Sequence, residues 1–106
     1  MAKKFLGEFE ELVLLAVVKL GEKEAYGISI GDLIEEVTGK RVAIGALYTT
    51  LSRLEEKGLL FSKLGEATIE RGGKAKRFYG ITKEGAQALR ESQEVRTALR
   101  PNTALA

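Results

Sequence analysis

The side chains best suited to bind a phosphate-bearing partner are gathered between positions 71 and 83. This segment holds five basic residues and no acidic one: Arg71, Lys74, Lys76, Arg77 and Lys83. The rest of the chain carries 12 of the 17 basic residues and all 15 acidic ones, so it is slightly acidic although the whole chain has a net charge of +2. A local excess of positive charge on such a chain favours a polyanionic partner. The alternative is a lysine-rich edge strand whose charge discourages aggregation.

This basic segment is predicted to form a β-hairpin. Gly72 and Gly73 supply the positive φ angles that a tight hairpin tip needs. The residues on either side alternate well enough for strands at 59–64 and 75–81. Thr82 then provides a side-chain N-cap for a last helix that follows the hairpin.

A helix is predicted just before the hairpin, over residues 43–57. Its apolar residues recur at intervals of three and four and define the core face: Ile44, Leu47, Leu51 and Leu54. Its first two turns otherwise carry small residues: Gly45, Ala46, Thr49 and Thr50. Small residues let a backbone approach base edges, and threonine can hydrogen-bond there or touch a thymine methyl group. This pattern favours a helix that enters the major groove of duplex DNA over a surface helix of weak helix formers. Gly45, Thr49 and Arg53 are therefore expected nearest the bases, and Tyr48 lies on the border between the core and the outer face.

The first predicted helix, residues 9–20, is apolar on nearly all sides. One stripe, at helical spacing, consists of Phe9, Leu12, Val13, Ala16, Val17 and Leu20. Leu14, Leu15 and Val18 make the far side apolar as well. Such a helix needs two surfaces to bury against, and a chain of 106 residues can scarcely wrap one completely. We therefore favour a second subunit against these three residues over a fully buried central helix.

Two further helices complete the predicted elements. Residues 26–38 form the second helix, which ends at Gly39 and whose apolar stripe is Ile30, Leu33, Ile34 and Val37. Gly31 in its interior costs about 1 kcal/mol relative to alanine, and its missing side chain would let another helix approach closely. The last helix, residues 83–99, has few apolar residues. It is expected to dock on a partner subunit through Leu89, Val95 and Leu99.

Composition places the chain among globular proteins with one compact domain. Hydrophobic residues make up 44% and charged residues 30% of the sequence. No apolar run approaches the roughly 18 residues of a membrane span, and the first residues do not resemble a signal peptide. The absence of cysteine excludes a disulfide framework and a thiolate metal site, which fits a reducing cytoplasm.

An enzyme is the opposing hypothesis, and the residue types disfavour it. With no histidine and no cysteine, the usual general base, thiol nucleophile and zinc ligands are missing, so no catalytic residue, metal or cofactor is expected. The sequence Gly72-Gly73-Lys74 does not meet the spacing of a phosphate-binding loop. The acidic pairs at 10–11, 35–36 and 55–56 are interpreted as solvated helix faces.

Several short motifs, in this order and spacing, resemble the PadR family of bacterial transcriptional regulators. They are AYG at 25–27, TG at 38–39, GALYTTLSRLEEKGLL at 45–60, GE at 65–66, ERGGKAKRFY at 70–79 and IT at 81–82. Each motif is weak alone, whereas the set is specific. The resemblance extends from about Phe9 to Leu89, and the short tail is similar to the smaller PadR-like branch.

The resemblance implies a mainly α fold with a small β-hairpin, a winged helix-turn-helix. It implies a DNA-binding domain over residues 1–82 and a C-terminal dimerisation helix, with a frayed end, over 83–106. Its function would be that of a homodimeric repressor that binds a pseudo-palindromic DNA operator. The residues expected at DNA are Tyr26, Gly45, Tyr48, Thr49, Arg53, Arg71, Lys74, Lys76 and Arg77. The alternative is a winged helix that binds protein without specific DNA binding.

The sequence departs from the family pattern at two places. PadR-like sequences commonly have serine, often followed by proline, where Ala43 and Ile44 stand here, so a helix cap worth about 1 kcal/mol is missing. The hairpin is less basic, with Ala75 and Gly80 where basic residues are frequent. Some short PadR-like repressors hold flat aromatic drugs between tryptophans, and this chain has no tryptophan. That mode of sensing does not carry over, and the sequence identifies no small-molecule effector.

Overall fold

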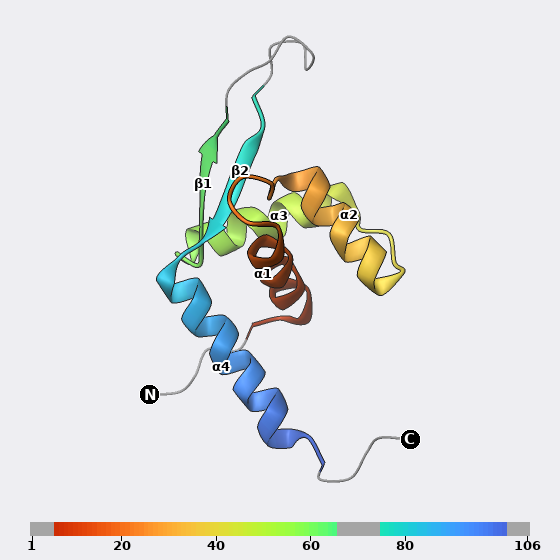
Figure 1. The fold of residues 1–106 in the computed structure, drawn as a ribbon, viewed down its shortest axis with the longest axis vertical. Coiled ribbons are helices and arrows are strands. Elements are labelled where there is room, and N and C mark those ends of the chain that lie inside the picture. Colours follow the sequence, from red (N-terminus) through yellow and green to blue (C-terminus); the bar gives the residue numbers. More distant parts are fainter. Residues whose placement is uncertain (1–5, 66–74, 102–106) are drawn as a thin grey trace.

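Four helices and one hairpin make up the computed structural model, which describes residues 6–65 and 75–101 (Figure 1). The elements are α1 (Glu8–Leu20), α2 (Gly27–Thr38), α3 (Ile44–Glu56), β1 (Leu60–Leu64), β2 (Arg77–Ile81) and α4 (Lys83–Leu99). Their order confirms the predicted winged helix-turn-helix with one added helix. The boundaries agree with the predicted ones to within one or two residues. The hairpin tip predicted at Gly72 and Gly73 lies outside the described residues.

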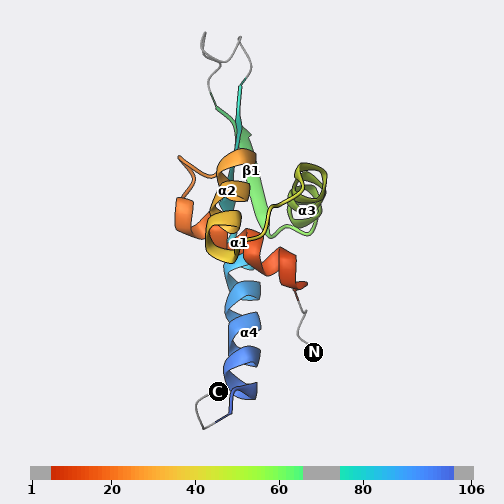
Figure 2. The same ribbon diagram turned by 90° about the vertical axis from the view of Figure 1, so that its right-hand side faces the viewer.

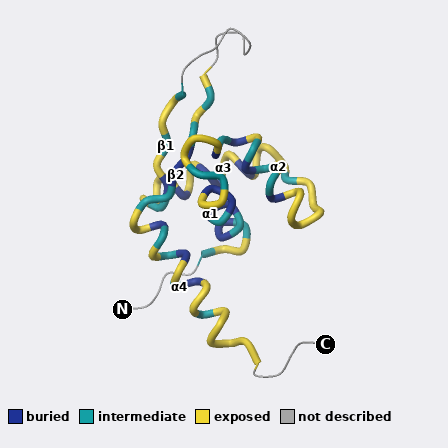
Figure 3. The backbone as a smooth tube through the Cα atoms, in the orientation of Figure 1, coloured by how far each residue is buried: buried dark blue, intermediate teal, exposed yellow. Residues whose placement is uncertain are grey.

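The arrangement places α1 at the centre, with α2, α3 and the hairpin around it (Figure 1). The hairpin and α4 extend toward opposite ends of the molecule, as the turned view also shows (Figure 2). The distal half of α4 leaves the body of the fold and is mostly exposed (Figure 3). Among the described residues, no helix is long and apolar enough to cross a membrane.

The core is built from all six elements. Its buried residues are Val13, Leu14, Ala16, Val17, Ala25, Ile30, Ile34, Leu47, Leu51, Leu54, Leu60, Tyr79 and Leu89. Leu14 and Leu89 are thus buried within the single chain, which corrects the expectation that they face a partner. Leu15 and Val95 are half-buried, and Val18 and Leu99 are exposed. Only these four of the expected dimerisation residues remain available to a second subunit.

Two residues predicted to lie in the core are exposed instead. Val37 near the end of α2 is 71% exposed, and Ile44 at the start of α3 is 68% exposed. Both continue the apolar spacing of their helices, but they lie at helix ends. A helical stripe is buried only as far as another element covers it. In α3 the covered face consists of Leu47, Thr50, Leu51 and Leu54.

The hairpin is joined to the segment before α2. β1 and β2 pair antiparallel, from Leu60 opposite Ile81 to Leu64 opposite Arg77. The Tyr79 N–H donates a hydrogen bond of 2.8 Å to the Ala25 carbonyl. Tyr26 and Phe78 add an isolated antiparallel bridge beyond it. The segment that leads into α2 is therefore joined to β2 at Phe78 and Tyr79.

The acidic pair at the start of α1 is buried rather than solvated, which corrects its interpretation from sequence. Glu10 accepts a hydrogen bond of 2.9 Å from the Gly7 N–H, and its other oxygen lies 2.8 Å from the Lys57 ammonium. Glu11 accepts a 2.6 Å hydrogen bond from the Ser92 hydroxyl and 3.1 Å bonds from the Arg96 Nε. These carboxylates tie α1 to the end of α3 and to α4.

Acid is expected to weaken the fold through Glu10. Burial by itself would raise the pKa of Glu10, but the hydrogen bonds from Lys57 and Gly7 outweigh it and lower the pKa below its ordinary value of 4.5. A carboxyl whose pKa is lower in the folded state stabilises that state at neutral pH, and the stabilisation is lost as the pH falls through the folded pKa. We expect the unfolding free energy, measured with urea, to fall more between neutral pH and pH values well below 4.5 in the wild type than in Glu10→Gln. Equal losses in the two proteins would contradict this role.

Candidate nucleic-acid interface

The outer face of α3 presents the residues predicted to contact bases. Gly45, Thr49 and Arg53 are all exposed there, whereas Thr50 is buried. A shallow hollow of about 450 Å³ follows this face and is lined by Tyr48, Thr49, Ser52, Arg53 and Glu56. Recognition helices meet bases through their N-terminal turn. In α3 this turn contains Gly45, which has no side chain. As predicted, Ala43 precedes α3 without a side-chain cap.

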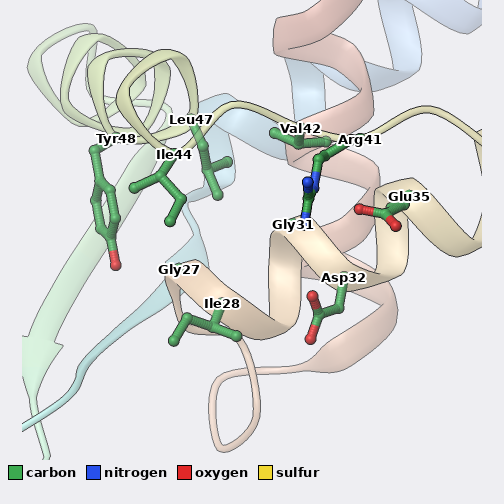
Figure 4. A pocket seen from close by; sticks show the side chains of 10 residues that line it. All are labelled: Gly27, Ile28, Gly31, Asp32, Glu35, Arg41, Val42, Ile44, Leu47 and Tyr48. Carbon is green, nitrogen blue, oxygen red and sulfur yellow. The ribbon is translucent and has the colours of Figure 1, made fainter.

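Tyr48 combines packing with exposure. The residue is 45% exposed, yet its hydroxyl lies against the backbone at Gly27, the first residue of α2. A Cβ atom at Gly27 would overlap that hydroxyl. Further along α2, a Cβ at Gly31 would lie 3.3 Å from the Leu47 side chain, so α2 and α3 approach closely at both glycines. Figure 4 shows Tyr48 and Gly27 on facing sides of the hollow between the two helices.

Gly27→Ala is expected to destabilise the protein by about 1–2 kcal/mol, because the added methyl group must displace the Tyr48 ring. In a protein that already carries Tyr48→Ala, adding Gly27→Ala should cost much less unfolding free energy than it does in the wild type, because the tyrosine ring that the methyl group would meet is gone. Urea unfolding of the four proteins measures this coupling. Additive losses would show that the two residues do not meet.

The tip-side end of β2 brings together two predicted DNA contacts, Tyr26 and Lys76. The Lys76 ammonium lies 3.8 Å from the centre of the Tyr26 ring, a cation–π contact. Phe78 meets the same ring edge-on, with 5.7 Å between centroids. Because Tyr26 immediately precedes α2, this stack holds the start of β2 against the helix-turn-helix.

Arg77 is linked to α3 through a serine. Its guanidinium donates a 3.0 Å hydrogen bond to the Ser62 hydroxyl, which donates a 2.8 Å bond to the Glu55 carboxylate. Beside them, burial raises the pKa of Tyr79 above its ordinary value, and the Glu55 charge adds to the shift. Arg77 itself stays exposed. Glu55 on α3 thus orients the Arg77 guanidinium of the hairpin through Ser62.

The positive charge of this face extends beyond the predicted residues. Lys40 and Arg41 are exposed in the connection between α2 and α3. Sequence reasoning did not count them among the candidates, although two adjacent basic residues before a helix that carries base-contacting candidates are a usable signal. Arg71 and Lys74, also predicted to contact DNA, lie outside the described residues. Within 6–65 and 75–101, no cluster of three acidic or histidine side chains could hold a metal ion.

These elements define the class of protein. A helix with a small, polar outer face stands beside a hairpin that bears exposed cations, as in winged helix-turn-helix regulators. Residues 14–91 match the family described as "Transcriptional regulator PadR-like family", so the chain belongs to the PadR-like family. Members of this family are transcriptional regulators and not enzymes.

Solved structures agree with the family. A PadR family transcriptional regulator from Eggerthella lenta is 30% identical, with a TM-score of 0.68 over 87% of this chain and 79% of that one. A PadR-like transcription factor from Bacteroides fragilis is 26% identical, with a TM-score of 0.71 over 86% and 82%. A transcriptional regulator from Clostridium thermocellum is 25% identical, with a TM-score of 0.71 over 84% and 82%. Among curated protein sequences, none matches this chain.

Proposed function

We propose that this chain is a homodimeric repressor that acts in the cytoplasm and binds a pseudo-palindromic DNA operator. The observation that carries the proposal is the pairing of an exposed helix face, Gly45, Thr49 and Arg53, with an oriented hairpin cation, Arg77. In this arrangement α3 enters the major groove and the hairpin follows the phosphate backbone. Residues 1–82 form the DNA-binding unit, and residues 83–106 serve dimerisation.

Two uncovered apolar surfaces support a dimer. A groove of about 270 Å³ between α1 and α2 is lined by Leu12, Leu15, Ala16, Lys19, Leu33, Ile34, Val37 and Thr38. Val18 lies exposed on α1, and Leu99 is 80% exposed at the free end of α4. Together with the half-buried Val95, Leu99 gives α4 an apolar edge that the described residues cover only in part. We place this edge against the α1 surface of a second copy.

The proposal is tested by selection from a pool of random DNA duplexes, followed by gel-shift titration of the enriched sequence. A two-fold dimer should enrich two inverted half-sites about one helical turn apart. Affinity should fall steeply with salt as counterions leave the phosphates. Selection that enriches no sequence, with equal affinity for all duplexes at physiological salt, would favour a winged helix that binds protein.

Thr49→Ala and Lys76→Gln are expected to separate base reading from positioning. Removing the Thr49 hydroxyl should cost about 1–3 kcal/mol at particular base pairs of the operator and almost nothing on random DNA. Removing the Lys76 charge should weaken all sequences about equally and lower the salt slope by about one. Gel-shift titrations of both variants at several salt concentrations provide the measurement. If Thr49→Ala kept the full preference for operator over random DNA, α3 would not be the reader.

A further inference from the structure

Ile44 is an exposed apolar residue at the start of α3, the end of a recognition helix that meets bases. It is the first residue of that helix and 68% of its surface is exposed. The described residues therefore leave most of this side chain uncovered. Apolar residues exposed singly are common and need no explanation. Ile44, however, is not alone.

Three exposed apolar side chains surround one hollow. Ile44, Tyr48 and, from α2, Ile28 rim a space of about 350 Å³ between α2 and α3 (Figure 4). Ile28 is 61% exposed and Tyr48 is 45% exposed. Ile44 and Tyr48, four residues apart, lie on one side of α3. The hollow therefore has an apolar edge that borders the outer face of the helix.

The position of Ile44 limits what that edge can meet in a bound duplex. The N-terminal turn of a recognition helix is the part that approaches base edges. Gly45 beside it carries no side chain, and a Cβ placed there would meet no atom within 4 Å, so the start of α3 can lie close to the floor of a groove. In the major groove the apolar group that base pairs present is the C5-methyl of thymine.

We propose that Ile44 is a specificity-determining residue that packs on a thymine methyl group in each operator half-site. This inference rests on the proposed DNA binding and adds one base preference to it. Ile28 differs because α2 crosses the backbone, which places Ile28 against sugar and phosphate. Its contact should carry no base preference.

Uracil tests the proposal because it differs from thymine only by the methyl group. The probe is the duplex enriched by selection with the wild-type protein. Its thymines are replaced by deoxyuridine one position at a time, and dissociation constants are measured by competition. At one position in each half-site, the loss of the methyl should weaken binding by the wild type about fourfold, the equivalent of about 0.8 kcal/mol per buried carbon. Replacing both half-site thymines should weaken it about fifteenfold, since the contributions of separate positions add.

The variants assign that loss to Ile44. In Ile44→Ala the thymine-to-uracil ratio at this position should fall to about one, whereas Ile44→Val should keep most of it. Ile28→Ala is the matched control, with the same residue type and similar exposure on α2, and should keep the wild-type ratio. Thermal melting checks that each exposed-site variant stays folded.

Three outcomes would overturn the inference. Unchanged wild-type affinity with uracil at every position would show that no methyl group is read. The uracil effect could be equal in wild type and Ile44→Ala, which would assign the methyl contact to another residue. Selection that enriches no sequence would overturn the proposed function and this inference together.

Discussion

The double variant Leu15→Glu with Val18→Glu is expected to be a folded monomer that binds its operator about a hundredfold more weakly than the wild type. Leu15 is half-buried and Val18 is 51% exposed, so charges there can reach water in the monomer. In the proposed dimer the same charges would be buried without partners, which is strongly unfavourable. A monomer reaches only one half-site and loses about half of the specific binding free energy. Sedimentation and gel-shift titration measure the two effects.

The choice of residues decides whether this experiment is interpretable. Leu14 is fully buried in the core of the single chain, so a glutamate there would unfold the protein rather than split a dimer. Arg90→Glu makes the same change in net charge on the exposed side of α4 and should leave both assembly and DNA binding nearly unchanged. A double variant that still sediments as a dimer would remove the α1 surface from the interface.

The sequence predicts the elements well because their signals are local. Helical spacing of apolar residues marks α1, α2 and α3, and Thr82 marks the start of α4 with a side chain that accepts a 2.9 Å hydrogen bond from Gly85. The exposure of Gly45, Thr49 and Arg53 also follows from spacing within one helix. For these features, neighbours in sequence are neighbours in space.

What spacing missed depends on residues far apart in the chain. Glu10 and Glu11 look like a solvated pair, but their partners Lys57 and Ser92 lie 47 and 81 residues away. The stack of Lys76 on Tyr26 likewise requires the hairpin to return beside α2. The prediction that Ile44 lies in the core was wrong for a related reason. Periodicity gives a direction around a helix but does not show what covers the end of the helix. Such facts come only from the tertiary arrangement.

Gly85→Ala is expected to destabilise the fold by about 3 kcal/mol, toward the upper end of the range for overpacking. Gly85 lies in the first turn of α4, and a Cβ there would collide with the carbonyl oxygen of Leu59. A side chain could rotate away, as at Gly27, but a backbone oxygen cannot move without shifting the strand that follows. Thr82 also holds this junction, because its hydroxyl donates a 2.6 Å hydrogen bond to the Gly58 carbonyl.

Gly85→Ala should weaken the proposed dimer as well as destabilise the fold. Because α4 starts against Leu59, moving its first turn tilts the whole helix and the apolar edge at Val95 and Leu99. Gly45→Ala is the matched stability control, since a Cβ at Gly45 meets no atom within 4 Å and alanine favours a helix by up to about 1 kcal/mol. The unfolding free energy measured with urea should therefore fall in Gly85→Ala and rise in Gly45→Ala. A Gly85→Ala protein as stable as the wild type would mean that α4 does not press on the Leu59 backbone in solution.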